Sequence, residues 1–168
     1  MSLFASVQTG CLIAFALLLL RAAWQDWRTM EIADGISLGI VAVFVAWAAT
    51  GIAAGTFSLL DVAWALACAV GMFGVGTLAF AAGAMGGGDV KLAAAASLFA
   101  GPALILDFVT VTAVIGGLLG VAMLAGARVG PVASTGDCAV RTRLRGSLPY
   151  GPAIAGGGLW VALALALT

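Results

Sequence analysis

The sequence contains no histidine, and only 8% of its 168 residues carry a charge. The absence of histidine excludes Ser-His and Cys-His nucleophilic catalysis. The three cysteines, Cys11, Cys68 and Cys138, are scattered and form no CxxC pair, so we expect neither a metal site nor a cofactor. The formal net charge is zero and no basic patch is present. Nucleic acid is therefore not an expected partner.

Apolar residues are abundant instead. They make up 64% of the chain, and the mean hydropathy is +1.21. In a soluble domain about a quarter of the residues are charged, whereas a lipid bilayer accepts long apolar segments. The composition therefore predicts a chain embedded in the bilayer, and its length predicts one domain over residues 1–168.

The apolar segments predict an all-α, polytopic membrane protein with six transmembrane helices, since about 20 apolar residues span the hydrocarbon. The first segment follows no basic residue, so we interpret it as a retained helix rather than a signal peptide. Pro102 favours a turn at Gly101–Pro102, with a turn at Asp107 as the alternative. The predicted helices are Phe4–Ala23, Gly35–Ala53, Val62–Ala84, a short helix from the glycine stretch to Gly101, Ala103–Ala127 and Pro149–Leu167.

Positive charge falls on one side of this arrangement. All seven Lys and Arg residues lie at the first, third and fifth connections: Arg21, Arg28, Lys91, Arg128, Arg141, Arg143 and Arg145. The positive-inside rule makes that side cytoplasmic and places the N-terminus outside. Asp26 and Asp89 then lie at the same, cytoplasmic, face.

These two acids are the candidate catalytic pair. Asp26 follows the first apolar segment, and Asp89 follows Gly86, Gly87 and Gly88. An acid at membrane depth indicates a functional site, and two adjacent carboxylates can share one proton and activate a water. The three glycines are candidates for substrate binding, because a backbone edge without side chains can pair with an extended peptide.

Other charged residues near the acids have two interpretations each. Glu31 and Asp34 are candidates to bind a basic segment of the substrate, or they pair locally with Arg21 or Arg28. Lys91 and Arg28 are candidates to support the catalytic site. The alternatives are that Lys91 is an anchor at the membrane surface, that Asp89 simply pairs with Lys91, and that Asp26 pairs with Arg28.

The sequence resembles a known family at three places. GGGDVKL at residues 86–92 is similar to GxGDxKL, the signature of the type IV prepilin peptidases, which are GxGD membrane aspartyl proteases. Residues 26–28 (DWR) resemble the D-x-R pattern of the family, although residues 32–34 (IAD) depart from its I-P-N. Residues 149–152 (PYGP) are similar to its P-x-G-P before the last helix.

This resemblance implies a membrane aspartic endopeptidase of the bacterial inner membrane, with its active site facing the cytoplasm. It implies Asp26 and Asp89 as the catalytic acids, and a membrane-anchored prepilin, cut after its short basic leader, as the partner. The chain lacks a cysteine-rich insert and resembles the compact branch that serves Flp pili; methylation of the product stays open. The alternatives are a proton-coupled transporter using Asp89 as its proton carrier and an inactive scaffold of pilus assembly.

Overall fold

The computed structural model describes residues 3–30, 32–125 and 150–167, and in these residues all regular structure is α-helical. The prediction of an all-α protein is confirmed. Glu31 and the arginines of the predicted fifth connection lie outside the described residues. The helices are α1 (Leu3–Thr29), α2 (Asp34–Ala53), α3 (Leu59–Ala81), α4 (Gly87–Leu124) and α6 (Gly151–Leu167).

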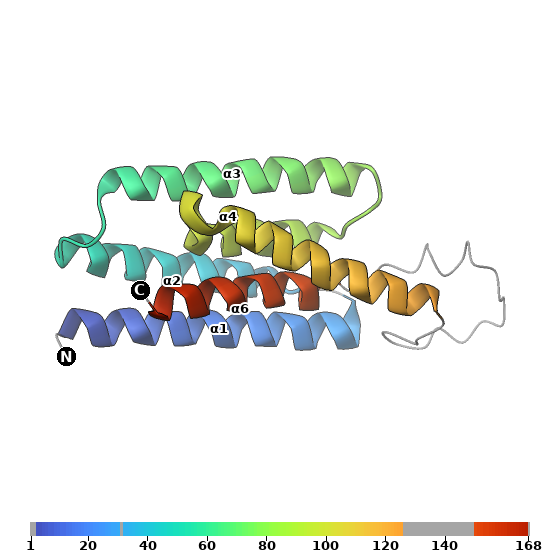
Figure 1. Cartoon of the computed structure of the whole chain (residues 1–168), viewed down its shortest axis with the longest axis horizontal. Helices are drawn as coiled ribbons and strands as arrows, with labels where there is room; N and C mark the ends of the chain where they lie inside the picture. The colour runs from blue at the N-terminus through green and yellow to red at the C-terminus, as the bar shows by residue number, and fades with distance from the viewer. Residues whose placement is uncertain (1–2, 31, 126–149, 168) are drawn as a thin grey trace.

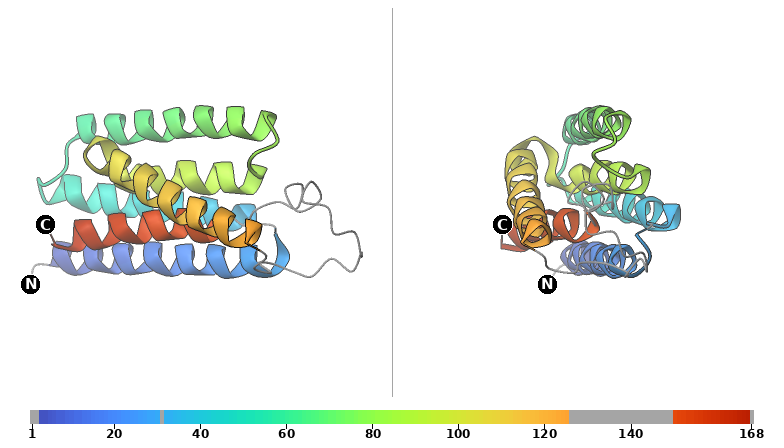
Figure 2. Two further views of the ribbon diagram at one scale, coloured as in Figure 1. Left: turned by 45° about the vertical axis from the view of Figure 1, so that its right-hand side comes forward. Right: turned by 90° about the vertical axis from the view of Figure 1, so that its right-hand side faces the viewer.

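The helices lie roughly parallel to one long axis (Figure 1). α1 and α6 run antiparallel along one side, α2 packs against α1, and α4 packs against both α2 and α6. α3 packs on α4 at the edge of the bundle, as both views of Figure 2 show. The end of α1, the starts of α2, α4 and α6, and the end of α3 therefore meet at one end of the molecule.

A break inside α4 settles the position of one predicted turn. Gly101 is non-helical (φ 51°, ψ −167°) and Pro102 follows it. Glycine tolerates this positive φ, and proline cannot donate to the preceding turn. The chain reverses here, and the second part of α4 runs back along the bundle (Figure 2). The turn predicted at Gly101–Pro102 is thus observed, whereas the chain passes through Asp107 as helix.

The predicted count of six spans is not confirmed. Among the described residues, four helices are long and apolar enough to cross a membrane: α1, α2, α3 and α4. α4 counts as one element of 38 residues despite its break, and α6 has only 17 residues.

Several predicted boundaries were also wrong, and α3, for example, ends at Ala81 instead of Ala84. α1 continues through the polar stretch to Thr29 instead of ending at Ala23. α3 begins at Leu59 instead of Val62, because Ser58 and Asp61 cap its first turn with two reciprocal hydrogen bonds.

The outer surface of the bundle is apolar. Large hydrophobic side chains such as Leu17, Val70, Leu78 and Leu106 are 60–77% exposed. A soluble protein rarely exposes an apolar surface over several neighbouring elements. Together with four helices that are long and apolar enough to cross a bilayer, this surface indicates a membrane protein.

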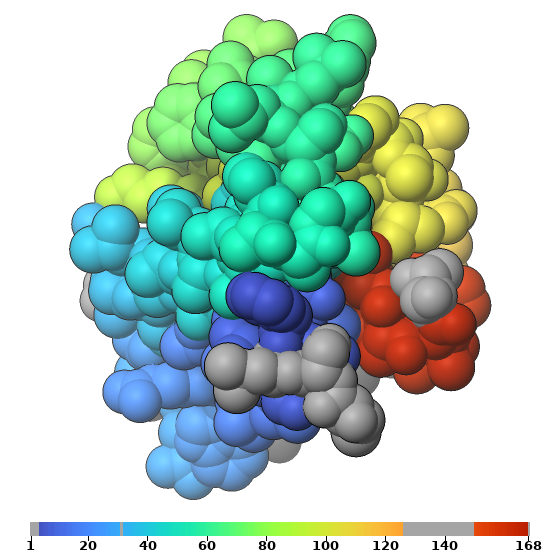
Figure 3. Space-filling model, turned by 90° about the vertical axis from the view of Figure 1, so that its left-hand side faces the viewer, coloured from blue at the N-terminus to red at the C-terminus, as the bar shows by residue number. Residues whose placement is uncertain are grey.

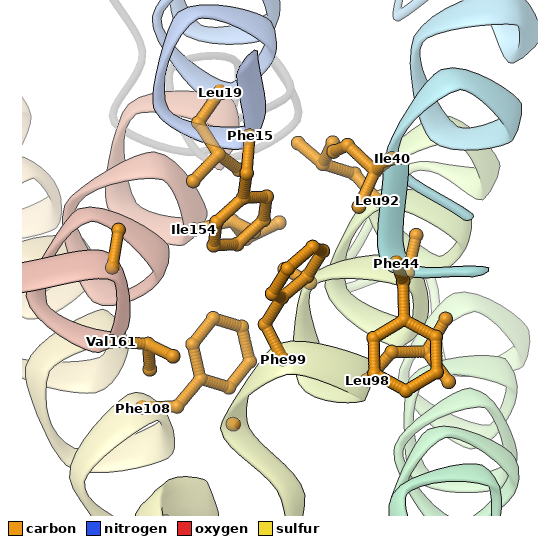
Figure 4. Close-up of a cluster of buried hydrophobic side chains, with 14 of the residues drawn as sticks. Phe15, Leu19, Ile40, Phe44, Leu92, Leu98, Phe99, Phe108, Ile154 and Val161 are labelled. Carbon is orange, nitrogen blue, oxygen red and sulfur yellow. The ribbon is translucent and has the colours of Figure 1, made fainter. Parts of the chain in front are cut away.

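Aromatic packing holds the centre of the bundle together. Phe99 of α4 stacks on Phe15 of α1 with ring centroids 4.1 Å apart, and it meets the edge of Phe44 of α2 at 5.4 Å. Figure 4 shows Phe15 and Phe44 pointing toward Phe99 from the two neighbouring helices. One side chain of α4 thus contacts both helices that lead into and out of the connection after Asp26.

We expect Phe99→Ala to destabilise the protein by about 2–3 kcal/mol, since it opens a cavity of roughly 100 Å³ at about 24 cal/mol per Å³. The burial term adds little because lipid is as apolar as the core. Unfolding in mixed micelles measures the change. Leu106→Ala, on the exposed face of the same helix, is the matched control. An equal loss for both variants would contradict the central role of Phe99.

Candidate active site

Asp26 lies on the buried face of α1, near the end of that helix. Its side chain is only 3% exposed. It continues a regular stripe of buried residues, Leu12, Phe15, Leu19 and Ala22, whose spacing matches one face of an α-helix. The helical period, rather than a loop, therefore turns this carboxylate toward the interior.

Asp89 enters the same region from the first turn of α4, and it is 7% exposed. Its Oδ2 accepts a hydrogen bond from the Gly86 N–H at 3.2 Å, the arrangement by which an acid in the first turn caps its own helix. Its Oδ1 is buried and accepts no hydrogen bond from the described residues. A buried carboxylate oxygen without a partner is costly, so this atom is suited to bind a water or a substrate group.

The two carboxylates share one cavity at the end of the bundle where α1 and α3 end and α4 begins. Its volume is about 270 Å³, and Asp26 and Asp89 both line it with Met30, Ile32 and Gly86–Gly88. The carboxylates are close enough for their charges to interact. Because a water occupies about 30 Å³ in the liquid, the cavity can hold a water together with a short stretch of peptide.

A second, larger cavity lies at the opposite end of the molecule. Figure 3 shows that end, with the start of α1 between the α2–α3 connection and the end of α6. Its volume is about 810 Å³, and its described lining includes Gln8, Thr9 and Trp47 but no ionisable side chain. It therefore offers no group for acid-base chemistry.

The glycines before Asp89 have different surroundings. A Cβ on Gly86 would lie 2.9 Å from Asp89 Oδ2, and a Cβ on Gly88 would lie 3.1 Å from Ile32 Cβ and 3.3 Å from its carbonyl oxygen. On Gly87 it would meet only Phe80, at an ordinary 3.7 Å. Packing thus favours glycine at positions 86 and 88, whereas position 87 has room for a Cβ.

Met30 also lines the cavity, and no pattern in the sequence indicated this. It has φ 55°, a left-handed conformation that costs a residue with a side chain roughly 1–2 kcal/mol. Its N–H still donates to the Asp26 carbonyl oxygen at 2.9 Å. The helix therefore ends at Thr29, one turn after Asp26, and the chain turns to place Ile32 over Gly88.

The predicted supporting residues lie outside this cavity. Lys91 Nζ pairs with Asp34 Oδ1 at 2.8 Å, and both side chains are exposed. Asp34 therefore pairs with Lys91 of α4, not with Arg21 or Arg28, the local partners considered for it. Lys91 in turn pairs with Asp34 and not with Asp89. Arg28 stacks on Trp24, 4.5 Å from its ring centroid. Glu31 lies outside the described residues.

Gly151 is a further neighbour of Asp26. Its backbone N–H, in the first turn of α6, donates to Asp26 Oδ2 at 2.8 Å in a buried environment. The sequence predicted Gly151 only as a part of the P-x-G-P pattern, without a role. The P-x-G-P pattern at the start of the last helix could have suggested a role for Gly151 near the site.

Comparison with known protein families shows a match to this chain. Residues 13–121 match the model of the type IV leader peptidase family. The matched range contains Asp26, Asp89 and the residues that line their cavity, and it ends before α6. No curated protein and no solved structure matches the chain.

Proposed function

The chain belongs to the type IV leader peptidase family, and from this premise we propose that it is an aspartic endopeptidase that removes the basic leader of a prepilin. The observation that carries the proposal is the meeting of two buried carboxylates, Asp26 and Asp89, in one cavity. They come from separate helices, and the described lining of the cavity contains no other ionisable side chain.

In the proposed reaction the two carboxylates share one proton. The ionised carboxylate takes a proton from a water, whose oxygen forms a bond to the scissile carbonyl carbon, while the protonated carboxyl gives its proton to the carbonyl oxygen. In the second step one hydroxyl of the tetrahedral intermediate gives its proton to the ionised carboxylate, the carbon–nitrogen bond breaks, and the amine leaves with the proton of the other carboxyl. The pair then again holds one proton, and the resting state is restored.

The proposed orientation places this cavity at the cytoplasmic face of a bacterial inner membrane, with the N-terminus outside. The positive residues of the described chain lie near the cavity end of their helices: Arg21 and Arg28 in the last third of α1, and Lys91 in the first two turns of α4. The remaining arginines of the sequence fall between α4 and α6, whose facing ends lie there too. Such asymmetry supports a cytoplasmic site. If α4 crosses the membrane twice, once on each side of its break at Gly101, and α6 crosses once, the chain makes six crossings.

Asp34 and the glycines are proposed to receive the substrate. Because the Asp34–Lys91 pair is exposed, it contributes about 0–1 kcal/mol, and a basic residue of the leader can replace Lys91 at little cost. A Cβ on Gly87 would meet only Phe80, at 3.7 Å, and the glycine offers its backbone to an extended peptide. The compact chain without a cysteine-rich insert favours prepilins of the Flp type.

The test is cleavage of a purified, membrane-anchored prepilin by the purified protein in vesicles. We expect a shortened product, detected by mass spectrometry, whose mass defines one cut after the leader. A prepilin with neutral residues in place of the basic leader residues is the matched control, and it should be cut more slowly. An intact substrate together with proton flux into the vesicles would favour the transporter, and neither activity would favour a scaffold.

A further inference from the structure

α6 meets α1 closely along one seam of small residues. Gly151 lies against Asp26, and about two helical turns further along Gly158 lies against Leu19. Small residues let helices in a membrane approach closely. The approach at the first of these positions brings a backbone group of α6 to the catalytic region of α1.

That backbone group has a specific use. The first N–H groups of a helix have no partner within the helix, and that of Gly151 donates to Asp26 Oδ2 at 2.8 Å. Hydrogen bonds to an ionised acceptor are shorter and stronger than neutral ones. Since Asp26 is 3% exposed, water does not compete freely for this oxygen, and the bond fixes the rotamer of the acid.

Position 151 also has no room for a side chain. A Cβ there would lie 2.6 Å from Asp26 Cβ, 2.8 Å from Oδ2 and 2.9 Å from Cγ. Because the closest atom is Asp26 Cβ, rotation of the side chain cannot relieve the contact, and either Asp26 or α6 would have to shift. The glycine and the acid are therefore compatible only as a pair.

We propose that Gly151 is a positioning residue for Asp26, holding one carboxylate oxygen so that the other is available to the water. This inference rests on the proposed peptidase function and assigns a catalytic contribution to α6, which lies beyond the range matched to the family.

The kinetic test is Gly151→Ala, with Gly158→Ala as the matched control. The control crowds the same seam, because its Cβ would lie 2.5 Å from Leu19 Cδ1, but it leaves Asp26 alone. We expect Gly151→Ala to lower kcat for prepilin cleavage by about 100-fold, as for a misplaced catalytic group, with KM nearly unchanged. Gly158→Ala should also lower the melting temperature in detergent but keep kcat within about threefold.

A spectroscopic test does not depend on activity. In the protein labelled with ¹⁵N-glycine, the Gly151 amide signal is the one missing from Gly151→Ala. We expect Asp26→Ala to move it strongly upfield and Asp89→Ala to leave it nearly in place. If the Gly151 amide signal did not move in Asp26→Ala, or if Gly151→Ala and Gly158→Ala lowered kcat equally, the inference would be overturned. A wild-type protein that cuts no prepilin would instead refute the proposed function, whatever the amide signal does.

Discussion

Asp26→Asn and Asp89→Asn are each expected to lower kcat for prepilin cleavage by about 10⁴-fold or more, the upper end of what a general acid or base contributes. Asparagine has the shape of aspartate but can neither hold nor release the shared proton. Both carboxylates line the same cavity, so either substitution removes the pair as a whole. The measurement is the single-turnover rate of product formation in vesicles.

The double variant tests whether the two acids act as one unit. Residues that act as one unit show non-additive losses, so Asp26→Asn/Asp89→Asn should be no slower than the worse single variant. Asp107→Asn is the matched control, because Asp107 lies exposed on the same helix as Asp89, away from the cavity. If the kcat losses of the two single variants multiplied in the double variant, or if Asp107→Asn also lowered kcat strongly, the two acids would not act as a pair.

The meeting of the two acids was predictable from the sequence because it depends on helix order. Alternate connections of antiparallel spans lie at the same end, and Asp26 and Asp89 fall at such connections. The extent of α1 was predictable in principle, yet the prediction ended at Ala23. Hydropathy falls at Trp24, whereas the spacing of Leu19, Ala22 and Asp26 continues the buried face.

Other features depend on contacts between segments far apart in the chain. Lys91 pairs with Asp34 because the starts of α4 and α2 lie side by side, whereas the sequence places a different charged residue, Asp89 or Arg28, nearer to each of them. Gly151 reaches Asp26 only because small residues bring α6 close to α1. Contacts between different helices depend on how the helices pack, and the spacing of residues along one helix does not determine that packing.

Gly86→Ala is expected to lower kcat by about 100-fold, because a misplacement of a catalytic group by about 1 Å has an effect of that size. Its Cβ would lie 2.9 Å from Asp89 Oδ2, and Asp89 would have to move. Gly87→Ala should behave differently, since its Cβ meets only Phe80, at 3.7 Å. The acid stays in place and kcat is kept, while a methyl group beside the proposed peptide edge raises KM.

Gly71→Ala is the reference for both variants, because no atom lies within 4 Å of a Cβ at that position of α3. It measures what the exchange of glycine for alanine does to helix stability alone. Initial rates over a range of prepilin concentrations separate kcat from KM for all three variants. If Gly87→Ala lowered kcat as strongly as Gly86→Ala, crowding of Asp89 would not be the reason for the first glycine. The glycine stretch would then act through its flexibility, and the packing account of the G-x-G pattern would fail.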